Sequence, residues 1–445
     1  MQDVSKSPMA AGGRVLSSFL GWASRTRRHD LVAQARALLS ERGEASGTAL
    51  AAELLAHYDA LDTAQRIAFL KRLALEFGAD RQRLQQALER YRQDASPRHE
   101  LALHAAAEPL RQELIRRLNR APGGTGRLLA MRADLLRALD REPDLALLDA
   151  DFRHLFSSWF NPGFLVLKRI DWDTPALILE KIIRYEAVHE ITSWDDLRRR
   201  IDPEDRRCFA FFHPVVAGEP LIFVEVALTT EMPAAIAPLL ATERRPLPAR
   251  RATTAVFYSI SNCQLGLRGV PLGNFLIKRV VEELKRELPN LRQFVTLSPV
   301  PEFMAWLARQ RHDPQALALS ASDRAVLAAL DSGGAWQRDA AVVRRLRPVL
   351  TAAIAYYLLR ARDATGRVPD PVARFHLNNG ARLERINWLA DPSPKGMAQA
   401  AGFMVNYFYD LRQIEENHEK FVKDGTVAAS RAVQRLLRSA DPRAE

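Results

Sequence analysis

The residues in this 445-residue chain with the clearest chemical potential form a short loop in front of an amphipathic helix. The loop reads Arg268-Gly269-Val270-Pro271-Leu272-Gly273, and Asn274 follows it. Apolar residues then recur at helical spacing, namely Ile277, Val280, Val281, Leu284 and Leu288. Backbone N–H groups at the start of a helix have no partner inside it, and the helix dipole favours negative charge there. We therefore predict that this loop binds a phosphate group.

The loop carries neither of the two common nucleotide fingerprints. A mononucleotide loop ends in Gly-Lys followed by Ser or Thr, but here Gly273 is followed by Asn274. The dinucleotide pattern Gly-x-Gly-x-x-Gly is also missing. Spacing alone is equally consistent with a glycine-containing turn that only joins a strand to a helix. Both interpretations stay open at this point.

Apolar strands flank the loop and its helix. Residues 254–261 precede the loop and residues 294–297 follow the helix, so the three elements form a crossover unit with parallel strands. Further strand patterns cover 164–167, 208–212, 221–228, 385–388 and 404–409. A helical interval rich in Ala and Arg covers about 302–362. We predict a mixed α/β (α+β) sheet with a helical insertion at about 302–362.

The chain before residue 149 has a different texture. Residues 31–148 show almost only helical periodicity, with little strand pattern and no cluster of candidate ligands. The domain organisation we predict is a flexible lead-in (1–30), an all-α N-terminal helical bundle that serves oligomerisation (31–148), and the mixed-sheet domain (149–445). A homo-oligomer is the expected assembly.

Composition narrows the class of protein. No run of eighteen uncharged apolar residues occurs, so we expect no transmembrane helix and no membrane partner. Two cysteines, Cys208 and Cys263, cannot build a disulfide framework or a thiolate zinc site, which favours a reducing cytoplasm. The net charge of +11 suggests nucleic acid, but the arginines are interleaved with acidic residues as on solvated helices. We expect no nucleic-acid partner, because the same positive field also attracts a polyanionic small ligand.

The order of antiparallel strands, loop, helix, strand and short helix resembles the GNAT fold of acyl-CoA-dependent N-acetyltransferases. In that fold the loop holds the pyrophosphate of coenzyme A. Arg268 and Gly273 fit the ends of its pattern, but Pro271 replaces the inner glycine. In the later short helix Ala373, His376 and Gly380 fall on the family's spacing, with His376 in place of the usual tyrosine.

A narrower resemblance accounts for both departures. Several ordered blocks are similar to the malonyl-CoA decarboxylase family: Asn161-Pro162-Gly163-Phe164-Leu165, Gly218-Glu219-Pro220-Leu221, Phe257-Tyr258-Ser259-Ile260-Ser261, Gly269-Val270-Pro271-Leu272-Gly273, Leu297-Ser298-Pro299-Val300-Pro301, and Phe375-His376-Leu377-Asn378-Asn379-Gly380 through Arg385-Ile386-Asn387-Trp388. The resemblance covers about residues 150–410. Several blocks in one order are more specific than any single motif.

The resemblance implies conversion of malonyl-CoA to acetyl-CoA and CO2, in fatty acid metabolism, without a metal or an organic cofactor. It assigns His376 as proton donor and Ser298 as proton acceptor or substrate hydrogen-bond partner. The CoA phosphates would lie on residues 268–274, and Asn378, Asn406 and Tyr409 could orient the substrate. Two other functions stay open: a GNAT-type acyltransferase that needs an amine acceptor, and a basic interaction module without CoA affinity.

Overall fold

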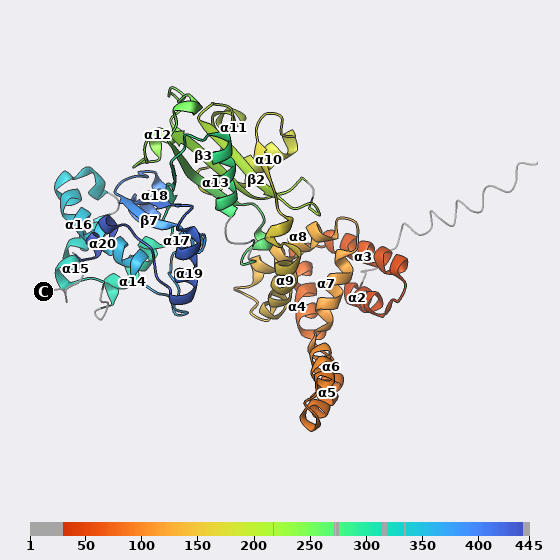
Figure 1. The fold of residues 1–445 in the computed structure, drawn as a ribbon. Coiled ribbons are helices and arrows are strands. Elements are labelled where there is room, and N and C mark those ends of the chain that lie inside the picture. The colour runs from red at the N-terminus through yellow and green to blue at the C-terminus, as the bar shows by residue number, and fades with distance from the viewer. Residues whose placement is uncertain are drawn as a thin grey trace, which may run out of the picture. The chain divides into compact units, whose positions relative to one another are not determined.

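The computed structural model describes residues 30–438 except 217, 271, 273–275, 314–317 and 333–334. The predicted lead-in therefore lies outside the described residues, apart from Asp30, which caps the first described helix. The chain divides between Phe152 and Arg153 into two compact units (Figure 1). Among the described residues, no helix is both long enough and apolar enough to cross a membrane.

The first unit is helical throughout its described residues (Figure 1). Some of its helices begin behind acidic caps, such as Asp62, which accepts a hydrogen bond from the backbone of Gln65 in a capping box. Apolar stripes from several helices, including Leu54, Leu70 and Leu114, are fully buried against one another. The helices are α2 (Leu31–Ser40), α3 (Glu44–Asp59), α4 (Thr63–Glu76), α5 (Arg81–Gln93), α6 (Pro97–Ala107), α7 (Leu110–Asn119), α8 (Gly124–Ala138) and α9 (Leu145–Trp159), which runs across the division. The oligomerisation role of this unit stays a prediction.

The second unit contains an eight-stranded mixed sheet with the order β1-β2-β3-β4-β5-β8-β6, and β7 pairs with β8. Neighbours are antiparallel except β4 and β5, which run parallel as the crossover unit requires. The predicted fold class is therefore confirmed. The strands are β1 (Val166–Ile170), β2 (Arg206–Phe212), β3 (Pro220–Thr229), β4 (Thr254–Asn262), β5 (Gln293–Thr296), β6 (Ser298–Pro299), β7 (Arg382–Asn387) and β8 (Met404–Phe408).

Helices cover this sheet and supply the predicted insertion. The insertion lies between β6 and α17, and its buried aromatic residues Phe303, Trp306 and Tyr357 pack together. The helices are α10 (Ala176–Tyr185), α11 (Trp194–Ile201), α12 (Ala237–Leu240), α13 (Leu276–Glu287), α14 (Phe303–His312), α15 (Ala321–Leu327), α16 (Ala340–Leu359), α17 (Pro371–Asn378), α18 (Pro394–Ala400), α19 (Ile414–Asp424) and α20 (Arg431–Arg438). Short 3-10 turns are η1 (Pro162–Phe164), η2 (Ala249–Arg251), η3 (Leu265–Leu267), η4 (Ala328–Ser332) and η5 (Ala335–Arg338).

The central strands β2 and β3 are buried at nearly every position, so both faces of the sheet are covered there. One apolar cluster joins α10 and α11 to the sheet through residues such as Leu179, Ile182 and Phe223. The second cluster contains Val256 and Val295 from the parallel pair. Strands buried on both faces read as continuous apolar runs, which is why β2, β3 and β4 are evident in the sequence.

Candidate active site

The sheet opens at the carboxyl ends of its two parallel strands. β4 and β5 pair only from Thr254 to Phe257, and the last contact is the Leu297 N–H, which donates to the Phe257 carbonyl at 3.0 Å. Beyond this point Ser298 leaves β4 and pairs with Val405 of β8. The second half of β4 is left without a neighbour on that side. Ligands of open α/β sheets bind where strands diverge in this way.

A register shift in β4 lies at the same opening. Glu225 of β3 faces Ser259, but the next residue, Val226, faces Phe257, so Tyr258 has no opposite residue. Such a bulge bends the strand and re-aims its side chains. Tyr258 and Ile260 thereby line the opening.

Ser298 and His376 meet at the base of this opening. A hydrogen bond of 2.9 Å joins Ser298 Oγ and His376 Nε2, although the two residues lie 78 positions apart in sequence. On its other side, His376 Nδ1 bonds the Tyr409 hydroxyl at 2.8 Å. Ser298 Oγ also donates to Thr296 Oγ1 at 2.9 Å. The four side chains form a continuous buried chain of hydrogen bonds.

Helix α17 places His376 through local sequence signals. The Asp370 carboxylate accepts hydrogen bonds from Val372 N and Ala373 N at 3.0 and 2.9 Å, and Pro371 occupies the first turn. Gly380 follows the helix with a φ of 75°, and a Cβ there would meet the Ile414 carbonyl oxygen at 2.0 Å. Only glycine fits this position, so the helix end is fixed against α19.

Burial sets the protonation state of the histidine. His376 is 2% exposed, and desolvation lowers the pKa of its imidazole to about 3. No charged group in the described part of the chain offsets this loss of water. The imidazole is neutral at physiological pH. It stacks on Tyr407 with ring centroids 4.5 Å apart, which holds its orientation.

A small cavity of about 210 Å³ lies over the Ser298–His376 pair. Its wall is mostly apolar and comes from β4, α17 and the segment after α10. The lining residues are Val188, Phe257, Tyr258, Ile260, Asn262, Ser298, Pro299, Pro371, Val372, Phe375 and His376. No Lys, Arg, Asp or Glu belongs to this described lining. A group that enters it exchanges part of its water shell for mostly apolar contacts.

A buried carboxylate holds one wall of the small cavity. Glu186 accepts hydrogen bonds from Val188 N and His189 N at 2.8 and 2.7 Å and from the Ser259 hydroxyl at 2.7 Å. Lys395 donates to the carbonyl of Val188 at 3.1 Å from the other side. These bonds fix the segment that carries Val188 against β4. Sequence patterns gave no signal for this contact between distant segments.

A larger cavity of about 660 Å³ lies next to the small one and shares Asn262 and Phe375 with it. The predicted phosphate loop contributes Arg268, Gly269, Val270 and Leu272 to its lining. Pro271, Gly273 and Asn274 were also predicted to bind phosphate and lie outside the described residues. The two cavities therefore meet at Asn262 and Phe375, between the loop and the Ser298–His376 pair.

The predicted orienting residues separate into three positions. Asn378 lines the larger cavity. Asn406 is fully buried, donates to the Thr296 carbonyl at 2.7 Å and accepts from Asn387 Nδ2 at 2.8 Å, so its amide joins strands and lines neither cavity. Tyr409 also lines neither cavity and contacts His376. Burial raises the pKa of the Cys263 thiol in the larger cavity, which keeps it protonated.

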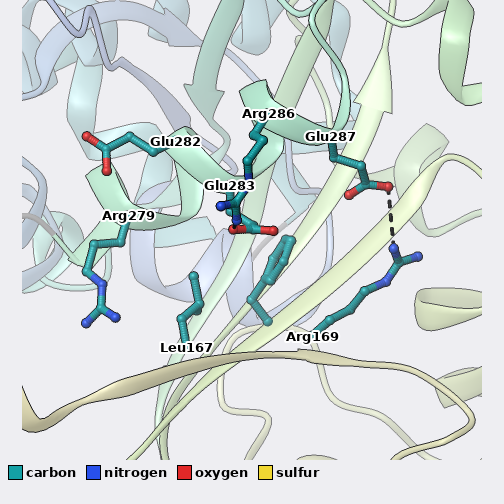
Figure 2. A pocket seen from close by; sticks show the side chains of 8 residues that line it. Leu167, Arg169, Arg279, Glu282, Glu283, Arg286 and Glu287 are labelled. Carbon is teal, nitrogen blue, oxygen red and sulfur yellow. Dashed lines mark hydrogen bonds and ion pairs between the residues drawn. The ribbon is translucent and has the colours of Figure 1, made fainter.

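A separate groove of about 830 Å³ lies over β1 and α13 (Figure 2). Several of its charges are paired: Arg169 contacts Glu287 at 3.4 Å, and Glu287 also binds Arg207 at 2.6 Å. Neither Ser298, His376 nor any loop residue lines this groove. Among the described residues, no group of three or more His, Cys, Asp or Glu side chains could hold a metal ion. The two-part cavity is therefore the candidate active site.

A mixed sheet with a diverging parallel pair, a glycine loop before α13 and a buried serine–histidine pair define an α/β enzyme of GNAT-like topology. Comparison with models of known protein families identifies the family to which the chain belongs. The malonyl-CoA decarboxylase C-terminal domain matches residues 163–445, and the malonyl-CoA decarboxylase N-terminal domain matches residues 77–160. The chain belongs to the malonyl-CoA decarboxylase family.

Individual relatives agree with this assignment. The chain is 35% identical to the mitochondrial malonyl-CoA decarboxylase of Anser anser anser, over 86% of this chain and 82% of that protein. The crystal structure of malonyl-CoA decarboxylase from Rhodopseudomonas palustris is 58% identical with a TM-score of 0.89, over 91% of this chain and 98% of that one. The corresponding protein from Agrobacterium vitis is 54% identical with a TM-score of 0.86, over 92% and 99%. The predicted family is confirmed.

Proposed function

We propose that this protein decarboxylates malonyl-CoA to acetyl-CoA and CO2, with His376 as proton donor and Ser298 as hydrogen-bond partner or proton acceptor. The observation that carries the proposal is the 2.9 Å contact between Ser298 and His376 at the inner end of a cavity that begins at residues 268–270. The relatives from goose and mouse bear the name of this activity. The thioester of the substrate would lie in the small cavity and its phosphates at the loop.

The reaction requires a place for an electron pair and a proton. The bond between carbon 2 and the carboxylate breaks, CO2 leaves, and the electron pair passes into the thioester as an enolate. Hydrogen-bond donors at the thioester oxygen stabilise that charge. His376 Nε2 lies at the cavity wall, and Ser298 Oγ can donate as well once its proton turns from Thr296 to the substrate. One proton must then reach carbon 2. The overall reaction takes up one proton and releases one CO2.

Substrate binding raises the pKa of His376, so that the imidazole can carry that proton. The free imidazole is neutral because burial lowers its pKa to about 3. The malonyl carboxylate brings a negative charge into the same cavity, and an adjacent opposite charge raises the pKa of an imidazole. His376 takes up a proton as the substrate binds and delivers it to carbon 2 after CO2 leaves. Tyr409 holds Nδ1 throughout, so Nε2 faces the substrate.

The apolar wall favours loss of the carboxylate. Val188, Ile260 and Val372 line the small cavity, and its described lining contains no Lys or Arg. A carboxylate in such surroundings loses water and gains no cation from the described lining other than the His376 imidazolium, whereas neutral CO2 has no such desolvation cost. The cavity therefore destabilises the bound carboxylate relative to the products.

The donor groups proposed here come from the chain itself, so we propose that turnover needs no metal and no organic cofactor. Activity should persist after dialysis against EDTA and should not rise on addition of Mg²⁺, Mn²⁺ or Zn²⁺. A metal requirement would contradict this part of the proposal. Malonyl-CoA is the small-molecule partner.

The decisive assay uses the full-length purified chain with malonyl-CoA and no amine. Mass spectrometry should show acetyl-CoA accumulating with an equal amount of CO2. An acyltransferase would instead release CoA only when an acceptor amine is added. Salt-sensitive nucleic-acid binding without turnover would support the interaction module and overturn the decarboxylase proposal.

Assembly and compartment remain part of the proposal. We propose a homo-oligomer formed through the helical region 31–148 and a cytoplasmic location, with neither nucleic acid nor membrane as a partner. Light scattering on the purified protein tests the first point, and fractionation of the source cells tests the second.

A further inference from the structure

Arg153 lies beside the loop that borders the larger cavity. It is the first residue of the second compact unit, near the middle of α9. A Cβ built on Gly269 would lie 3.8 Å from Arg153 Nε. Gly269 has a φ of 74°, so it turns the loop at this point and leaves no side chain between its backbone and the guanidinium. Arg153 is not among the lining residues of the larger cavity, so it approaches the loop from outside.

Aromatic packing keeps the end of α9 in place within the unit. Phe156 and Phe160 are fully buried, and the ring of Phe160 lies 5.0 Å from that of His213, just after β2. A few residues further on, Arg279 of α13 donates to the Leu165 carbonyl at 2.9 Å. The helix that carries Arg153 is thus attached both to the sheet and to the helix that follows the loop. Its position beside Gly269 is a consequence of the packed core.

The charge of Arg153 is available to a ligand. Its side chain is exposed, and no hydrogen bond or ion pair joins it to another residue in the described part of the chain. Most other arginines near the sheet are paired, such as Arg169 and Arg207 with Glu287. A guanidinium presents a planar set of donors that matches two phosphate oxygens at once.

We propose that Arg153 binds a phosphate group of the CoA substrate and thereby fixes the outer end of the molecule at the loop. This inference rests on the proposed function, because it takes malonyl-CoA as the ligand. It adds a residue from α9 to a site otherwise built by the sheet, the loop and α17. The pantetheine arm would fill the larger cavity, and the phosphates would lie between residues 268–270 and the guanidinium.

Three substrates that differ in their phosphate groups distinguish a loss of phosphate binding from other effects of an Arg153 substitution. Malonyl-CoA carries all phosphates, malonyl-dephospho-CoA lacks the 3′-phosphate, and malonyl-pantetheine lacks every phosphate. For Arg153→Ala we expect KM for malonyl-CoA to rise about tenfold with kcat unchanged, because a charged hydrogen bond in binding is lost. With malonyl-pantetheine, KM should be the same for both proteins. Arg153→Lys should retain part of the affinity, because its point charge remains.

Malonyl-dephospho-CoA shows which phosphate Arg153 binds. If Arg153→Ala still has a higher KM than the wild type for this substrate, Arg153 binds the pyrophosphate. If the two KM values become equal, Arg153 binds the 3′-phosphate. Arg251→Ala is the matched control, since Arg251 is also exposed, has no partner in the described part of the chain and carries the same charge. An equal KM rise with malonyl-pantetheine, or no rise with malonyl-CoA, would overturn the proposal. If the wild-type protein does not decarboxylate malonyl-CoA, the proposed function fails. Calorimetry with CoA and pantetheine on wild type and Arg153→Ala then still tests Arg153.

Discussion

The two cavities of the candidate site differ in size, hydration and the kind of residue they offer. The small one has about 210 Å³, an apolar wall and two buried hydrogen-bonding side chains at its base. The larger one has about 660 Å³ and is bordered by a loop and by Asn378, Asn379 and Gln264. We infer from this difference that the reaction occurs in the small cavity and that the CoA part of the substrate is recognised in the larger one. Residues of the small cavity should affect kcat, and residues of the larger cavity should affect KM.

The strongest test of this division is His376→Ala. The substitution removes both the proton carrier and the bond to Ser298, so we expect kcat to fall about a thousandfold. KM should change less than threefold, because the larger cavity stays intact. Steady-state kinetics measures both quantities, and His104→Ala, on a helix of the first unit, serves as the control. A kcat near that of the wild type would remove His376 from the mechanism.

The pH dependence tests how the proton arrives. The pKa of His376 in the free protein is lowered to about 3, so its protonated fraction rises as pH falls from 8 to 5. If the imidazolium donates the proton, kcat/KM should increase by up to about tenfold per pH unit over that range. A profile that is flat in this range would mean that the neutral imidazole only donates a hydrogen bond to the enolate.

Tyr409→Phe probes the support behind His376. The change deletes the 2.8 Å bond to Nδ1 and keeps the ring, so we expect kcat to fall about tenfold with KM unchanged. Tyr357→Phe is a matched control, because the Tyr357 hydroxyl is buried without a hydrogen-bond partner among the described residues. Equal kinetic losses in the two variants would show that Tyr409 acts only through packing.

Val188→Thr tests whether the small cavity must stay apolar. Thr has nearly the same shape as Val but adds a hydroxyl that can hydrogen-bond the bound carboxylate. Stabilising the carboxylate before it leaves should lower kcat about fivefold and should lower KM as well. Val215→Thr, at a 61% exposed position, should leave both constants unchanged. An unchanged kcat for Val188→Thr would show that desolvation contributes little.

Gly269→Ala addresses the loop end and should have the smallest effect. Its φ of 74° disfavours a side chain by about 1 kcal/mol, so the loop should shift and raise KM about threefold with kcat unchanged. Gly366→Ala carries the same backbone strain at φ 77° with no atom within 4 Å. It should lower thermal stability to a similar degree without changing KM. A lower kcat for Gly269→Ala would contradict the assignment of kcat effects to the small cavity alone.

Local patterns predicted the elements that carry the site. The cap of Asp370, the first-turn proline and the left-handed Gly380 each depend on residues close in sequence, so local patterns are enough to place them. The pairing of Ser298 with β8 was not evident from its strand pattern. It depends on Leu297 holding the last contact to β4, which is a contact between segments about 40 positions apart.

Contacts between distant segments also explain the other differences. Asn406 was predicted to orient the substrate from its residue type, but its amide is used between strands by Thr296 and Asn387. Thr296 itself, which accepts from Ser298 Oγ and from Tyr407 N, was missed because a single threonine in an apolar strand carries no signal. Hydrogen bonds of this kind join strands that are distant in sequence, so the partners can be identified only from the tertiary structure.

The amino-acid sequence alone determined the helical and mixed-sheet regions, the loop before α13 and the family, since periodicity, caps and ordered motifs are local properties of the chain. Only the tertiary structure decided that Ser298, His376 and Tyr409 share one hydrogen-bonded chain, that the cavity above them has a mostly apolar lining, and that Arg153 reaches Gly269. Burial removes water from a group only when segments far apart in sequence pack around it. The protonation state of His376 follows from that packing and is absent from any local pattern.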